Sequence, residues 1–117
     1  MAINRFPKST TVSGFYTGQI ETVSDKVYTV DPSTDHALTI TSVFAKTGSG
    51  TVAWLLKQGS SNVAVMSLSS STGVYGSAIS NASVAAGETI TMTTSSNSSG
   101  TDLVFRIGYE YEVDLDE

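Results

Sequence analysis

The last fifteen residues alternate between apolar and polar side chains more regularly than any other segment of the chain. Residues of one parity are apolar or aromatic: Leu103, Phe105, Ile107, Tyr109, Tyr111, Val113 and Leu115. The other parity carries most of the charge in the segment: Asp102, Arg106, Glu110, Glu112, Asp114 and Asp116. Because successive side chains of a β-strand point to opposite faces, this pattern predicts one long strand. At roughly 3.3 Å per residue, the part from Leu103 to Val113 would span about 35 Å, with an apolar inner face and an acidic outer face.

Shorter alternating runs predict further strands upstream, with apolar inner faces in residues 38–44, 52–56 and 90–92 and with Trp54 in the core. The Gly-containing residues 48–50 predict a hairpin between strands at 37–46 and 51–57. Residues 97–100 predict the last turn, which feeds the C-terminal strand. No apolar period of 3.6 residues persists for three turns, so we expect about eight strands and almost no helix.

Short strands with turns every 8 to 12 residues predict a single all-β antiparallel sandwich, jelly-roll-like. An immunoglobulin-like sandwich is the alternative, although its Cys-Trp-Cys pattern is absent. We assign the sandwich to residues 20–117. Residues 1–19 have apolar side chains without a period, interrupted by Pro7. They are interpreted as either an edge strand or an extended N-terminal arm that lays Phe6, Phe15 and Tyr16 onto a neighbouring subunit.

Composition excludes several classes of function. The chain has no cysteine, which rules out a disulfide scaffold, a thiolate zinc site and a cysteine nucleophile. Its net charge is −5, and its six basic residues are scattered, so nucleic acid is not an expected direct partner. No apolar run resembles a signal peptide or reaches transmembrane length, so we expect no membrane partner and folding in a cytoplasm.

The candidate chemical sites all have simpler interpretations. His36 lies near Asp31 and Asp35, but a Ser-His-Asp site needs a positioned nucleophile that no motif supplies, so His36 is interpreted as a turn residue. The aspartates lack the spacing of a calcium loop. Of the aromatic residues that could stack on sugars, only Tyr75 lies outside the predicted core parity. We therefore expect no enzymatic activity, no cofactor and no metal.

Several segments resemble small structural proteins of tailed-phage virions of the β-sandwich type. The resemblance covers roughly residues 26–113, and its main feature is a strand, an Ala-Gly-acid-Thr turn at residues 86–89 and a last strand rich in aromatics at 104–111. It also includes residues 27–30 and 37–43. The resemblance implies a capsid decoration (cement) protein, a head-fibre base or a tail-associated module. It further implies a homotrimer with N-terminal arms that grip the coat.

The acidic strip of the last strand has two interpretations, which both stay open. It consists of Glu110, Glu112, Asp114 and Asp116. Charge on an edge strand discourages sheet-to-sheet aggregation, and the same strip could dock onto Lys and Arg of a coat subunit.

Together these observations predict a non-enzymatic capsid decoration protein that binds the major capsid protein on the outer surface of the virion and stabilises the coat lattice by mass action. The predicted contacts are Phe6, Phe15 and Tyr16 with the acidic strip. The alternative is a tail or head-fibre module that binds a receptor or a glycan.

Overall fold

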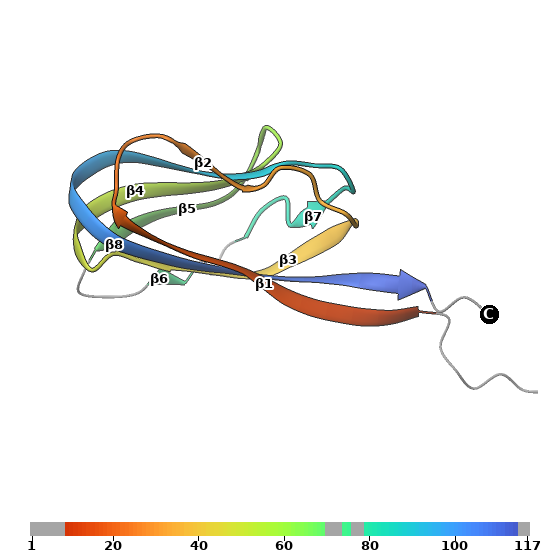
Figure 1. Ribbon diagram of the computed structural model, residues 1–117. Coiled ribbons are helices and arrows are strands. Elements are labelled where there is room, and N and C mark those ends of the chain that lie inside the picture. Colours follow the sequence, from red (N-terminus) through yellow and green to blue (C-terminus); the bar gives the residue numbers. More distant parts are fainter. Residues whose placement is uncertain (1–8, 70–73, 76–78, 115–117) are drawn as a thin grey trace, which may run out of the picture.

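A computed structural model describes residues 9–69, 74–75 and 79–114, and for Ser9, Val74, Tyr75 and Asp114 it describes the backbone. This part of the chain is all-β and forms eight strands (Figure 1). In chain order they are β1 (Ser9–Thr22), β2 (Val27–Asp31), β3 (Leu38–Lys46), β4 (Ser49–Gln58), β5 (Ser61–Ser69), β6 (Val74–Tyr75), β7 (Ser83–Val84) and β8 (Ile90–Asp114).

The strands form an antiparallel sandwich in which β8 belongs to both layers (Figure 1). In the upper layer, the first half of β8 lies between β2 and β4, and β5 pairs with the far edge of β4. In the lower layer, the second half of β8 lies between β1 and β3, and the short β6 and β7 pair with β3. The predicted all-β antiparallel sandwich is confirmed.

The turn predicted at residues 97–100 is a corner inside one continuous strand. Ser96, Ser99 and Asp102 have φ of 49°, 55° and 51°, and these left-handed residues bend β8 from the upper to the lower layer. Asn97 links the corner to Val23, the residue after β1. Its Nδ2 donates to the Val23 carbonyl at 2.6 Å and its Oδ1 accepts from the Gly100 amide at 2.9 Å.

The predicted hairpin between residues 37–46 and 51–57 is wrong. The strands β3 and β4 do not pair with each other, because each pairs with a different half of β8. Residues 47–48 between them lie at the corner instead, where the Gly48 amide donates to the carbonyls of Thr101 and Asp102. The actual hairpin is β4–β5, with the turn at residues 59–60.

The core lies between the two layers and contains Trp54, as predicted, together with Leu56, Ile90, Met92, Leu103 and Ile107. The Trp54 indole N–H donates to the Met92 sulfur at 3.1 Å. Of the side chains in residues 38–44 that were predicted to point inward, only Leu38 and Ile40 do so. A bulge between Ile40 and Ser42 shifts the register against β8.

Candidate docking surface

The bulge in β3 changes which side chains reach the outside of the lower layer. After it, Val43 and Ala45 are buried, whereas Phe44 points outward and is half-buried. Phe44 was predicted to point into the core with Leu38 and Ile40. It lies instead on the outer face of the lower layer, which we call the lower face.

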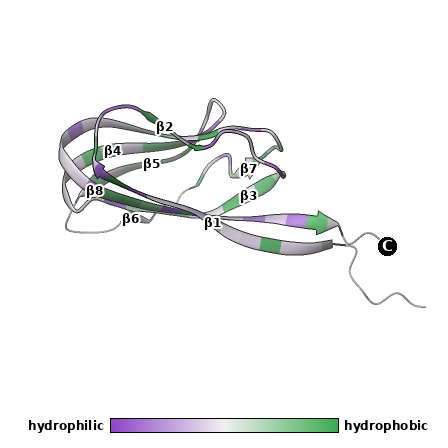
Figure 2. Cartoon of the chain, viewed as in Figure 1, coloured by the Kyte–Doolittle hydropathy of each residue, from purple (hydrophilic) through white to green (hydrophobic). Residues whose placement is uncertain are grey.

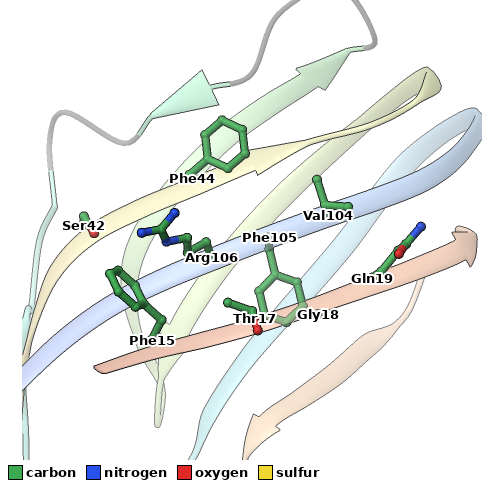
Figure 3. Close-up of a pocket in the computed structure, with 9 residues that line it drawn as sticks. All are labelled: Phe15, Thr17, Gly18, Gln19, Ser42, Phe44, Val104, Phe105 and Arg106. Atoms are coloured by element: carbon green, nitrogen blue, oxygen red, sulfur yellow. The ribbon is translucent and has the colours of Figure 1, made fainter. Parts of the chain in front are cut away.

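The lower face contains a groove of about 630 Å³ that crosses β1, β8 and β3 (Figure 3). Two rows of paired residues contribute to it: Phe15 and Ser42, on either side of Gly108, in one row, and Thr17, Arg106 and Phe44 in the next. Phe105 and Gly18 also line it, with Gln19 and Val104 at one end.

Arg106 and Phe15 form the most prominent contact on this face. The guanidinium lies 4.1 Å from the centroid of the Phe15 ring, within the range of a cation–π interaction. The Phe15 side chain is 52% exposed. Its ring covers Gly108, where an added Cβ would come within 3.3 Å of the ring. Arg106 extends past Phe15 toward Phe44 (Figure 3).

The glycines of β1 allow two more aromatic rings to cross from β8 to β1. Gly14 pairs with Tyr109, and Gly18 pairs with Phe105. An added Cβ would lie 2.6 Å from the Tyr109 hydroxyl at Gly14 and 2.7 Å from the Phe105 ring at Gly18. The rings therefore occupy the space of the missing side chains and fix β1 in register on β8.

The charges on the lower face are separated along β8. Arg106 is exposed at one end, and Lys46 belongs to the same end because it pairs with Val104. Glu110 and Glu112 are exposed at the other end, and Thr11 donates a hydrogen bond to Glu112. Gly108 lies midway between Arg106 and Glu110. Figure 2 shows this acidic end as a hydrophilic stretch near the end of β8.

Beyond β3, β1 and β8 continue as a two-stranded ribbon past the body of the sandwich (Figure 1). The pairing of β8 with β3 ends at Glu110, whereas its pairing with β1 continues to Ser9 opposite Asp114. We call residues 9–12 and 111–114 the ribbon tip. Residues 1–8 and 115–117 therefore both join the described structure at this tip.

The inner side of the ribbon is packed with aromatic rings. Tyr16 lies 4.7 Å from Tyr109, Tyr109 lies 6.2 Å from Tyr111, and Tyr111 stacks on His36 at 4.4 Å, all between ring centroids. The Tyr16 hydroxyl donates to the Asp31 carboxylate at 2.6 Å. Burial raises the pKa of Tyr16 well above its usual value, and the hydrogen bond to Asp31 and its negative charge raise it further.

The predicted partner-binding residues thus fall in different places. Phe15 is exposed on the lower face, whereas Tyr16 points to the opposite side of β1 and bonds Asp31. Glu110 and Glu112 are exposed on the lower face. Phe6, Asp116 and the Asp114 side chain lie outside the described residues.

A second hollow, of about 510 Å³, surrounds His36 and includes Asp35, Ser83, Tyr111, Glu110 and Glu112. His36 lies flat against Tyr111. Within residues 9–69, 74–75 and 79–114, no group of three or more His, Cys, Asp or Glu is arranged to hold a metal ion. The described residues also contain no helix long and apolar enough to cross a membrane.

Sequence reasoning missed Phe44 and Arg106 as members of the surface. For Phe44 the available signal was the apolar pair Val43 and Ala45, which falls on the opposite parity from Leu38 and Ile40. This change of parity indicates that the inward-facing positions of the strand shift by one residue after Thr41. For Arg106 the signal was its position opposite Thr17 and beside the glycine at 108, which requires the register of β1 to be known.

Comparisons with known proteins identify a shared fold but no protein family. No protein-family model matches the chain, and no curated protein matches it. Among solved structures, the chain is similar to one described in "Bacillus endospore appendages form a novel family of disulfide-linked pili". The TM-score is 0.56 with 11% sequence identity, over 99% of this chain and 98% of that one. The described part of the chain therefore shares the fold of that β-rich structural protein.

Proposed function

We propose that this chain is a non-enzymatic structural subunit that attaches to a larger protein assembly through the tip of the β1–β8 ribbon. The observation that carries the proposal is the position of that tip. It projects beyond the sandwich and joins both terminal segments, one with Phe6 and the other with Asp116 and Glu117. The apolar and the acidic predicted contacts are thereby attached to one end of the molecule.

The sequence resemblance favours a tailed-phage capsid as that assembly. In this proposal the chain decorates the outer surface of the virion and binds the major capsid protein with the apolar side chain of Phe6 and the carboxylates of the strip. A subunit that contacts several coat proteins only in the assembled lattice stabilises that lattice by its binding free energy. The homotrimer that the resemblance implies would add avidity, and it stays a prediction.

The test is attachment of the purified chain to empty heads of its phage assembled without it. We expect the chain to cosediment with the heads and to raise their resistance to heat. Deletion of residues 1–8 should abolish both effects, whereas deletion of residues 115–117 should reduce them less. The cut ends before Ser9 because residues 9–18 pair with β8, and a longer deletion would remove most of β1. Heads that bind no chain would overturn the capsid proposal.

A filament subunit is the second candidate, and the fold shared with a pilus protein favours it. The pili of that protein are disulfide-linked, but this chain has no cysteine, so its filaments would be held without disulfides. Electron microscopy of the concentrated chain distinguishes the two. Filaments that form without heads and persist in reductant would favour this second candidate.

The receptor- or glycan-binding alternative is also testable. Trp54 is buried in the core, so a bound sugar should change tyrosine fluorescence and leave the tryptophan signal unchanged.

A further inference from the structure

The outer face of the lower layer is self-complementary in charge about its central row of residues. That row contains Phe15, Gly108 and Ser42. Arg106 lies two residues to one side of Gly108 on β8, and Glu110 lies two residues to the other side. Four residues of strand separate the two charges by about 13 Å, too far for an ion pair within one subunit. The contact that the Arg106 guanidinium makes is with the Phe15 ring.

We propose that a second copy of this chain docks on the lower face about a two-fold axis that runs along this central row. A rotation of 180° about that axis brings two lower faces together and reverses the strand direction. Each residue of the central row then faces its own copy, and Arg106 of each subunit faces Glu110 of the other. The contact is isologous, as in most homodimers.

The neighbouring residues fit the same arrangement. The row that contains Gln19, Val104 and Lys46 faces the row of Thr11 and Glu112 in the second copy. Lys46 then lies one strand away from the partner's Glu112. Two cations thus face two carboxylates on each side of the axis, and the half-exposed Phe15 ring supplies apolar surface at the centre. Sheets that pack face to face keep their strands within about 30° of each other, so rows next to the axis stay matched.

This contact covers Thr11 and Glu112 on one face of the ribbon tip. It leaves the end of the tip, where both terminal segments join, available, so it is separate from the proposed attachment of residues 1–8 to a capsid. It involves β8 and the face of β1, and it differs from edge-to-edge pairing of two β1 strands. In such an edge pairing, Arg106 and Glu110 would lie one strand inside the junction and would not meet across it.

The experiment is a charge swap followed by the solution mass of the full chain, measured by light scattering over a concentration series. The unmodified chain should form this two-fold contact and be a dimer, or a hexamer where the homotrimer that the resemblance implies also forms. Arg106→Glu places a carboxylate opposite each Glu110 and should raise the dimer dissociation constant roughly 100-fold, and Glu110→Arg should do the same. The double variant Arg106→Glu/Glu110→Arg restores opposite charges across the axis and should restore the dimer.

Two controls separate this result from loss of folding. Circular dichroism and thermal unfolding verify that each variant keeps its fold. Lys57→Glu makes the same change of charge on β4, in the upper layer, and should leave the mass unchanged. A monomer at every concentration would overturn the two-fold contact. A dimer or trimer whose mass is insensitive to the Arg106 reversal would overturn it too. Neither outcome affects the head-attachment assay, in which residues 1–8 are the variable.

Discussion

At the scale of single residues, the hydrogen bond between Tyr16 and Asp31 ties the edge strand of the lower layer to the end of β2 in the upper layer. Asp31 also accepts a bond from the Ser33 amide at 3.1 Å, so its carboxylate is held in place from two sides. The sandwich is open between β1 and β2, because each pairs only with β8 among the described strands. Tyr16 closes this side.

Replacing Tyr16 with Phe removes that bond and leaves a partly buried carboxylate oxygen with one partner fewer. We expect Tyr16→Phe to lower the free energy of unfolding by about 1–2 kcal/mol at neutral pH. Tyr28→Phe is the matched control, since Tyr28 is half-buried on β2 and its ring contacts the Lys26 ammonium. Urea unfolding of the three proteins measures the difference, and equal losses in both variants would contradict the assigned role of the Asp31 bond.

The raised pKa of Tyr16 adds a dependence on pH with a definite sign. The folded state holds the phenolic proton more tightly than the unfolded chain, whose tyrosines titrate near pH 10. The stabilisation by Tyr16 is therefore complete below pH 10 and declines as the pH rises above it. The stability difference between the unmodified chain and Tyr16→Phe should shrink as the pH rises from about 10 to about 11. A difference that stays constant over this interval would show that Tyr16 titrates alike in both states.

At the scale of elements, alternation identified the strands well and their connections poorly. The inward parity of Leu103, Ile107 and Tyr109 was readable because β8 has no bulge against β1. The phase of β3 beyond Ile40 was predicted wrongly, since a single extra residue reverses the faces and the alternation of Val43 with Ala45 was the signal that was missed. The hairpin error has a related origin. A Gly-rich turn is equally compatible with a local hairpin and with a corner, and the choice depended on β8, more than forty residues away.

The corner of β8 yields a prediction about backbone conformation. Ser99 is exposed and has a φ of 55°, a region that costs an L-residue roughly 1 kcal/mol and glycine almost nothing. Ser99→Gly should therefore raise the free energy of unfolding by about 0.5–1 kcal/mol. The control is Ser95→Gly, at an exposed strand position without a positive φ, which should lower it by a similar amount. Thermal unfolding measures both, and changes of equal sign would contradict a strained corner.

At the scale of the whole molecule, the structure bears on the two interpretations of the acidic strip. Glu110 and Glu112 belong to β8, which is paired with β1 throughout its second half and with β3 as far as Glu110. The long open edge of the described lower layer is instead β1, which carries no charged residue between Ser9 and Ile20. If charge served chiefly to protect an edge, it would be expected on β1. Beyond Glu110, however, β8 is itself an edge of the two-stranded ribbon, so Glu112 keeps both interpretations. Glu110, which is paired on both sides, is better suited to contact with a partner.

The two interpretations of the strip predict different results when charge is removed from the ribbon tip. The double variant Glu112→Gln/Asp114→Asn removes two charges at the ribbon tip. It keeps Glu110, which faces Arg106 in the proposed two-fold contact, and changes Glu112 at the margin of that contact. If the strip docks on Lys and Arg of a coat protein, the variant should bind heads about ten-fold more weakly, and the binding of the unmodified chain should weaken with added salt. Its solubility should not change. If the strip protects an edge, the variant should aggregate at concentrations where the unmodified chain does not, while head binding stays intact. Cosedimentation with heads and light scattering of the variant alone separate these outcomes, because each interpretation predicts a change in only one of the two measurements.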